Sequence, residues 1–258
     1  KKNVVVALLR LQKEGLIERH GQRDGCYRKI ETELNFIEFD DSSEEPYPLI
    51  LPLKLHDMVE ISAGNIILVG GEFNAGKTTF MLETLLANKN GIPIRFISSE
   101  VSSQSEFKKR FRGYRGIPLS FWLPDAMTDY VARSNDFARA LKAGGLNLID
   151  YLEFPESDFT MGAEMLKQIH DRLAGGVAVV AVQKKKGQKL PRSGDLIMEK
   201  PRLAITLSGI EGTPYGIAEI VKAKIPKGGR HDGKRLRFEI VEHGSTFKIH
   251  DEWGFHKF

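Results

Sequence analysis

An eight-residue segment rich in glycine constrains this chain more than any other feature of its sequence. Its residues are Gly71, Glu72, Phe73, Asn74, Ala75, Gly76, Lys77 and Thr78. They fit the pattern G-x-x-x-x-G-K-[ST], which follows an apolar run at residues 66–69 and precedes an amphipathic segment at residues 79–87. A strand, a glycine-rich loop and a helix in this order are the context in which such a loop binds phosphate. We therefore expect a phosphate-binding loop at this point of the chain.

The residue types in this loop match the chemistry of a nucleoside triphosphate held with Mg²⁺. Glycines allow backbone N–H groups to turn toward phosphate oxygens, and the start of a helix adds a favourable dipole. Lys77 is expected to reach the β- and γ-phosphates, and the Thr78 hydroxyl is expected to bind Mg²⁺. Thr79 completes the predicted nucleotide contacts at residues 71–79. A degenerate loop that does not hydrolyse the nucleotide is the alternative.

Short apolar runs alternate with longer amphipathic stretches through most of the chain. The runs lie at residues 65–69, 92–97, 146–152, 177–182 and 203–207. Continuous apolar runs of this length are typical of strands buried on both faces of a parallel sheet. Their alternation with helical segments predicts an α/β fold with a mostly parallel sheet. Residues 235–249 predict two further strands around a turn at residues 242–245.

The chain predicts three regions. Residues 1–35 contain a helical pattern that ends near Gly15, where an apolar face would pack on a core, and then a hairpin around the turn at residues 21–25. The segment LLRLQKEGLIERHGQRDGCYR resembles the last helix and wing of winged-helix domains, and an ordinary helix–hairpin packed on its neighbour is the alternative. Residues 36–52 are acidic and rich in turn residues, which predicts a linker. Residues 53–258 would form the α/β domain.

Composition excludes several classes of protein. Of the 258 residues, 41% are hydrophobic and 28% are charged, which excludes a wholly disordered or collagen-like chain. No apolar run approaches the roughly 18 residues that span a bilayer, so we expect no membrane partner. The seven histidines and single cysteine lack the spacing of a zinc site. The net charge of +4 is too small to establish nucleic-acid binding by itself.

Two features bear on where the protein resides. Cys26 is the only cysteine, which excludes an internal disulfide and predicts a reducing cytoplasm. The chain begins with Lys1 and Lys2 rather than methionine, and the apolar stretch at residues 4–9 is too short for a secretory signal. We therefore interpret this start as the cut end of a longer protein.

Three polar residues follow predicted strands and are candidates for chemistry. Glu100 comes after the strand at residues 94–97, where its carboxylate could activate water, and a helix-capping role is the alternative. Asp150 ends the apolar part of the run at residues 146–150, where it could hold Mg²⁺ through water, and a strand-terminal turn is the alternative. Gln183 ends the strand at residues 177–182.

Residues 53–240 resemble a RecA-like ATPase of the replicative-helicase (DnaB-like) and RepA-like group. The likeness rests on the opening PLKLHDMVEISAGNIILVGGEFNAGKTTFMLE, on Glu100 and on the LIDYLEF segment that contains Asp150. It implies that Glu100 is the catalytic glutamate, and that Gln183 senses the γ-phosphate and relays its presence to DNA-binding loops. It further implies ATP hydrolysis at the interfaces of a homo-oligomeric ring or filament on single-stranded DNA.

Clustered basic residues are candidates for DNA contact. A segment directly after Gln183 carries five of them and no acid: Lys184, Lys185, Lys186, Lys189 and Arg192. Lysine and arginine bind the phosphate backbone by releasing counterions, and the resemblance places the corresponding loop in the central channel of a ring. A mobile, solvated loop is the alternative. The basic residues at 108–115 alternate with Phe107, Phe111 and Tyr114, which predicts a solvated helix face that packs on these aromatic residues.

The resemblance also implies a basic finger that reaches the nucleotide of the next subunit. Helicases of the group carry a Lys-x-Arg pair at this point, where the present chain has Lys222 and Lys224. Lysine lacks the bidentate fork of arginine, and Arg230 could serve instead.

These features favour an ATP-dependent DNA motor of the helicase or translocase type. By analogy with RecA-like domains fused to winged helices, it would replicate DNA or a mobile element. The alternative is an ATP-switched DNA-binding regulator, recombinase or loader with slow turnover and no unwinding.

Overall fold

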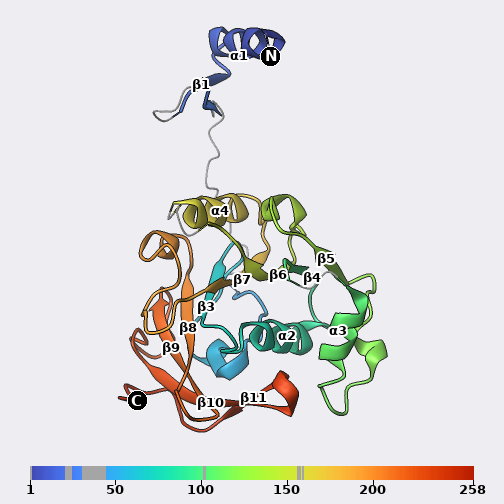
Figure 1. Cartoon of the computed structure of the whole chain (residues 1–258), viewed down its shortest axis with the longest axis vertical. Helices are drawn as coiled ribbons and strands as arrows, with labels where there is room; N and C mark the ends of the chain where they lie inside the picture. The colour runs from blue at the N-terminus through green and yellow to red at the C-terminus, as the bar shows by residue number, and fades with distance from the viewer. Residues whose placement is uncertain (1, 21–24, 31–44, 101–102, 156–157, 159) are drawn as a thin grey trace. The chain divides into compact units, whose positions relative to one another are not determined.

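The structure is a computed structural model, and it describes residues 2–20, 25–30, 45–100, 103–155, 158 and 160–258. The chain divides into two compact units, Lys1–Glu44 and Glu45–Phe258, which are described separately (Figure 1).

The first unit contains one helix and one hairpin in its described part. Helix α1 (Lys2–Lys13) leads into strand β1 (Ile17–Arg19), which pairs antiparallel with β2 (Tyr27–Lys29). The predicted helix and hairpin are therefore present. Val4, Val5 and Leu9 are each more than half exposed, so the described part of this unit does not bury the apolar face of the helix, and the expectation that this face packs on a core stays a prediction. The winged-helix interpretation stays a prediction.

The predicted linker at residues 36–52 is only partly described, since residues 36–44 lie outside the described part of the chain. Its second half belongs to the larger unit. Leu49 and Leu51 are buried in the core of that unit, and the Asn88 side chain of the following helix bonds to both backbone groups of Ile50. The compact unit consequently begins at Glu45 rather than at residue 53.

The larger unit is built on one nine-stranded sheet, in the order β11-β10-β9-β8-β3-β7-β6-β4-β5. Its strands are β3 (Ile66–Gly71), β4 (Ile94–Ser98), β5 (Thr128–Ala132), β6 (Leu146–Leu152), β7 (Val177–Gln183), β8 (Leu203–Gly209), β9 (Tyr215–Ala223), β10 (Arg235–Val241) and β11 (Thr246–Ile249). The six strands from β8 to β5 are parallel, and β9, β10 and β11 extend the sheet as an antiparallel meander. The predicted α/β fold and all the predicted strands are confirmed.

Helices connect the parallel strands, as the alternating sequence pattern predicts. They are α2 (Lys77–Asn88), α3 (Gln104–Phe111) and α4 (Met161–His170). Short 3₁₀ segments lie at Pro52–Asp57, Leu119–Trp122, Phe137–Ala140, Leu196–Met198 and Glu242–Gly244.

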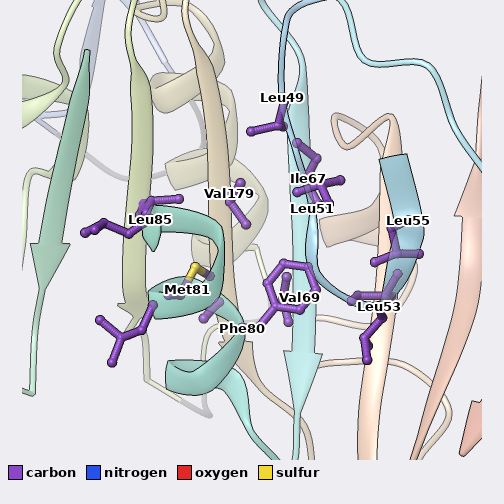
Figure 2. Packing of buried hydrophobic residues seen from close by; sticks show 14 of the residues in the cluster. Leu49, Leu51, Leu53, Leu55, Ile67, Val69, Phe80, Met81, Leu85 and Val179 are labelled. Atoms are coloured by element: carbon purple, nitrogen blue, oxygen red, sulfur yellow. The ribbon is translucent and has the colours of Figure 1, made fainter. Parts of the chain in front are cut away.

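Two hydrophobic clusters cover the two faces of the sheet. On one face, Phe80 and Met81 of α2 pack with Ile67 and Val69 of β3, and the segment from Leu49 to Leu55 lies beside them (Figure 2). On the other face, the alternate strand residues pack with α4. Because successive side chains of a strand point to opposite faces, one apolar strand serves both clusters. This two-sided burial fixes β3, and with it the loop that follows.

Candidate functional site

The chemistry-bearing residues meet at the carboxyl-terminal edge of the parallel strands. Gly71, at the end of β3, pairs in register with Gln183 at the end of β7. On the next pair, Ser98 at the end of β4 is level with Asp150 in β6. Glu100 follows β4 by two residues. In open α/β sheets this edge is where ligands bind, so sequence order and sheet topology place these residues together.

The glycine-rich loop turns directly from β3 into α2. Gly76 caps the helix with φ of 98°, a left-handed conformation that favours glycine, and Lys77 is the first helical residue. A Cβ atom at Gly76 would lie 2.8 Å from Ile240 and 2.9 Å from Phe247 of the β10–β11 hairpin. The loop therefore needs glycine both for its backbone conformation and for the close approach of this hairpin.

Lys77 is held inside the loop by three oxygen acceptors. Its Nζ donates to the carbonyls of Gly71 and Glu72 at 3.1 and 2.9 Å, and to Oε1 of Gln183 at 3.0 Å. Burial lowers the pKa of Lys77, while the carboxylates of Asp150 and Glu100 oppose that shift. The direct Lys77–Gln183 bond joins two residues that are 106 positions apart in the sequence.

Asp150 is a buried carboxylate beside the start of α2. It is 1% exposed, and neither of its carboxylate oxygens has a hydrogen-bond partner among the described residues. Burial raises the pKa of Asp150 to about 6, the Thr78 side chain opposes the shift, and the Glu100 carboxylate adds to it. Buried carboxylates normally have a hydrogen-bond donor or an ion beside them, so Asp150 is a candidate ligand for a cation.

Mg²⁺ fits this pair of side chains. The ion is held by one or two protein oxygen ligands together with substrate phosphates and water. The orphaned oxygens of Asp150 and the nearby Thr78 hydroxyl supply that donor set. The described residues contain no cluster of three or more histidine, cysteine, aspartate or glutamate side chains that would hold a metal without such help.

A cavity of about 460 Å³ opens over the loop. It is lined by the loop residues Phe73, Asn74, Gly76, Lys77, Thr78 and Thr79, by Leu82, Glu100, Arg110 and Gln183, and by Ile240, Gly244 and Ser245. The predicted residues Glu100, Lys77, Thr78 and Gln183 thus share one cavity. Glu100 is exposed at its margin, and the two residues after it lie outside the described part of the chain.

Two contributors to this cavity were not predicted from the sequence. The first is the β10–β11 hairpin, whose Gly244 carbonyl accepts a hydrogen bond of 2.7 Å from the Thr79 hydroxyl. The second is Arg110 of α3, which was predicted to lie on a solvated face. The aromatic residues around it indicate that one side of this helix packs inward, but they do not indicate that Arg110 lines a cavity.

Glu72 connects the loop to two neighbouring loops. Its carboxylate accepts from Lys184 Nζ at 2.9 Å and from the backbone N–H groups of Gly187 and Gly209 at 3.3 and 3.4 Å. Burial raises its pKa, but the Lys184 ammonium and the two N–H groups outweigh burial, so the pKa of Glu72 is lowered. Glu72 therefore links the phosphate-binding loop to the segments that contain Lys184, Gly187 and Gly209.

The contact between Glu72 and Lys184 shows that one predicted DNA contact is wrong. Lys184 has a side chain only 3% exposed, held by Glu72 and by the Gln188 carbonyl, so it is not available to a DNA backbone. Lys186 and Lys189 remain largely exposed and lie 3.3 and 3.7 Å from Glu211 and Glu219. Lys185 and Arg192 line a cavity of about 510 Å³ beside the loop. Because the Lys186 and Lys189 side chains are largely exposed, their ion pairs are weak and leave these two lysines accessible to a stronger anion.

The predicted finger is corrected in part. The Lys222 ammonium donates to the carbonyls of Met198 and Glu199, so its side chain is engaged within its own chain. Lys224 and Arg230 are exposed, and Arg230 lies 3.7 Å from Asp232. These two residues stay as the predicted finger.

No helix in the described part of the chain has the length and apolar character needed to cross a membrane.

Comparison with known proteins identifies the fold. No protein-family model matches the sequence, and no curated protein is similar to it. The structure is similar to that of RadB recombinase, with a TM-score of 0.53 and 16% identity over 71% of this chain and 90% of that one. It is also similar to a KaiC-like protein from Pyrococcus horikoshii OT3, with a TM-score of 0.60 and 18% identity over 80% of this chain and 99% of the other. The chain therefore shares the α/β fold of these two proteins.

Proposed function

We propose that this protein is an ATPase that hydrolyses MgATP and couples the reaction to DNA. The observation that carries the proposal is the cavity over residues 71–79, in which Lys77 and Gln183 are bonded to each other and Thr78 and Glu100 line the same space. Backbone N–H groups at the start of α2 and the Lys77 ammonium would hold the phosphates. The similar folds of RadB recombinase and the KaiC-like protein support this proposal.

Each residue has a distinct role in the proposed reaction. Thr78 and Asp150 would hold Mg²⁺, which when bound neutralises phosphate charge. Glu100, at the margin of the cavity, would polarise the attacking water. The Gln183 side chain accepts a hydrogen bond from the Lys77 ammonium, and a bound γ-phosphate would compete for that ammonium. Gln183 would thereby relay the presence of the γ-phosphate to the end of β7 and to residues 184–192.

The finer proposal is a helicase- or translocase-type motor acting on single-stranded DNA as a homo-oligomeric ring or filament in the cytoplasm. Its DNA contacts would be Lys185, Lys186, Lys189 and Arg192, which lie in the loop after β7. Lys224 or Arg230 would reach the nucleotide of the next subunit, and replication of DNA or of a mobile element would be the context.

A second candidate is an ATP-switched recombinase, loader or DNA-binding regulator with slow turnover. The hydrogen bond between Glu72 and Lys184 favours this second candidate, because it links the phosphate-binding loop directly to residues 184–192. In such a protein, nucleotide binding would set the conformation of that segment, and hydrolysis would only reset it.

Steady-state ATP hydrolysis with and without single-stranded DNA tests the proposal. We expect DNA to stimulate turnover, and Glu100→Gln to lower it by about 10²-fold or more, because general-base catalysis contributes at least that much. The matched control Glu164→Gln removes an exposed carboxylate on α4 and should leave turnover unchanged. Lys77→Ala should abolish nucleotide binding without unfolding the protein.

The outcomes separate the candidates. Stimulated turnover followed by strand displacement supports the helicase-type motor, and stimulated turnover without displacement supports a translocase or recombinase. ATP-dependent retention of DNA with negligible turnover supports the switch. An ATP affinity that Lys77→Ala leaves unchanged in an equilibrium titration would contradict both candidates.

A further inference from the structure

Ser99 lies between the end of β4 and Glu100, and its hydroxyl has no role in the chemistry described so far. Strand β4 ends at Ser98, and helix α3 begins at Gln104. Glu100 therefore lies on a connection between these two elements, where its own side chain is exposed. A general base must stay within hydrogen-bond reach of the water that it polarises. The connection consequently needs a fixed point close to Glu100.

Ser99 is bonded to β6 through both its backbone and its side chain. Its N–H donates to the Asp150 carbonyl at 3.0 Å. Its hydroxyl oxygen accepts the Tyr151 N–H at 3.3 Å and lies 2.9 Å from the Tyr151 carbonyl, to which it can donate. The paired register of β4 and β6 ends at Ser98 and Asp150, so the bonds of Ser99 extend the contact between these strands to the residue beside Glu100.

Glu153 is a second acceptor for the Ser99 hydroxyl. Its Oε1 lies 3.1 Å from the Ser99 Oγ. Glu153 directly follows β6, and its carboxylate also accepts a hydrogen bond from the Tyr151 hydroxyl. The Ser99 hydroxyl has one proton, so it donates either to Glu153 or to the Tyr151 carbonyl. Either bond holds Ser99 to the segment that follows Asp150.

These contacts connect Glu100 to the other groups of the candidate site. The Lys77 Nζ lies 5.9 Å from the centre of the Tyr151 ring. The Glu100 carboxylate acts electrostatically on the Lys77 ammonium and on the Asp150 carboxylate, which places it near both. A shift of Ser99 away from β6 would therefore move Glu100 relative to the phosphate-binding lysine and to the candidate metal ligand.

We propose that Ser99 is a positioning residue, whose hydroxyl bonds to Tyr151 and Glu153 hold the Glu100 carboxylate in place to accept a proton from the attacking water. The inference rests on the proposed ATP hydrolysis and adds a residue to it. In that step the water oxygen bonds to the γ-phosphorus, and the bond from the γ-phosphorus to the bridging oxygen breaks. The proton that water loses goes to Glu100, and ADP and phosphate leave.

An isosteric pair of variants tests this role. Ser99→Thr keeps the hydroxyl, whereas Ser99→Val has the same shape as threonine without it. We expect Ser99→Val to lower kcat at least about tenfold and to change the Kd of a non-hydrolysable ATP analogue less than about twofold, because small displacements of a catalytic group slow chemistry without removing phosphate contacts. Ser99→Thr should retain most of the turnover. The matched control Ser120→Ala removes an exposed hydroxyl and should leave turnover unchanged.

The Glu100→Gln background shows whether Ser99 acts through Glu100. Single-turnover hydrolysis with Mg²⁺ and ATP should be no slower in Ser99→Val with Glu100→Gln than in Glu100→Gln alone. An equal loss in both backgrounds would overturn the inference, and so would equal losses for Ser99→Val and Ser99→Thr.

The results also separate this inference from the proposed function. Wild-type protein that neither binds nor hydrolyses ATP overturns both. Wild-type turnover that Ser99→Val leaves unchanged overturns the inference alone. Thermal unfolding of each variant checks that the fold is retained, and Ser99→Ala takes the place of Ser99→Val in every measurement if the valine variant does not fold.

Discussion

At the scale of single residues, burial decides what a titratable side chain contributes. Glu83 lies on α2 and accepts the Phe247 N–H at 2.9 Å through its carboxylate. Burial raises the pKa of Glu83 to about 7, although that hydrogen bond opposes the shift. Burial also acts to raise the pKa of Glu72, in the loop before α2, but Lys184 and two backbone N–H groups outweigh burial, so this pKa is lowered. The pKa of Glu83 on α2 is therefore raised, whereas the pKa of Glu72 in the preceding loop is lowered.

Glu83 predicts a pH dependence of stability. Its pKa is about 7 in the folded protein and near 4.5 in the unfolded chain, so the folded state binds more protons between these values. Stability should fall as pH rises from about 4.5 to 7, by about 3 kcal/mol. Glu83→Gln keeps an acceptor for Phe247 and should be more stable than wild type at pH 7.5.

Urea denaturation of wild type and Glu83→Gln from pH 4.5 to 8 measures the difference. Asp150, with a pKa raised to about 6, contributes a slope of the same sign in both proteins, and the comparison cancels it. Parallel stability curves for the two proteins would refute the assignment.

At the scale of elements, the site is assembled where the β10–β11 hairpin meets α2 and α3. Thr79 of α2 bonds to Gly244, and Gly113 after α3 contacts Ser245. Each contact joins segments more than one hundred residues apart in sequence. The hairpin was predicted from the pattern at residues 235–249, but the pattern carries no information about which helix it packs against. The packing arises because β10 and β11 extend the sheet beyond β9.

A double-mutant cycle tests this contact. Gly113→Ala should destabilise the protein by about 1–3 kcal/mol, because its new methyl group overlaps the Ser245 hydroxyl. Ser245→Ala removes that hydroxyl and should cost less by itself. The double variant should recover much of the loss, which denaturant midpoints measure. Simply additive effects would show that the two residues do not meet.

At the scale of the whole molecule, charge distribution matters more than the net charge of +4. In the segment after β7, Lys184 is buried against Glu72, and the other four basic residues are those proposed to contact DNA. The neighbouring acids Glu211 and Glu219 partly neutralise two of them. DNA would have to displace these acids, so binding should depend strongly on salt.

We predict that changing Lys185, Lys186 and Lys189 together to alanine weakens single-stranded DNA binding and flattens its salt dependence. The slope of log K against log salt should fall by about 2, at about 0.7 for each lost phosphate contact. Fluorescence anisotropy at several salt concentrations measures it. A control that changes the exposed Lys167, Lys248 and Lys257 removes the same charge from other segments. Equal slopes for the two triple variants would exclude this loop as the DNA contact.

The sequence by itself determined the α/β fold, the phosphate-binding loop and the candidates Glu100, Asp150 and Gln183. These depend on local periodicity and on residues at strand ends, and parallel strands bring such ends to one edge whatever their order. The tertiary structure alone decided which charged side chains are free. Lys184 and Lys222 look like exposed cations in the sequence, yet they are held by Glu72 and by backbone carbonyls of their own chain. Arg110 looked like a solvated residue, yet it faces the cavity. The physical reason is that burial and pairing of a charge depend on distant segments, which no local pattern records.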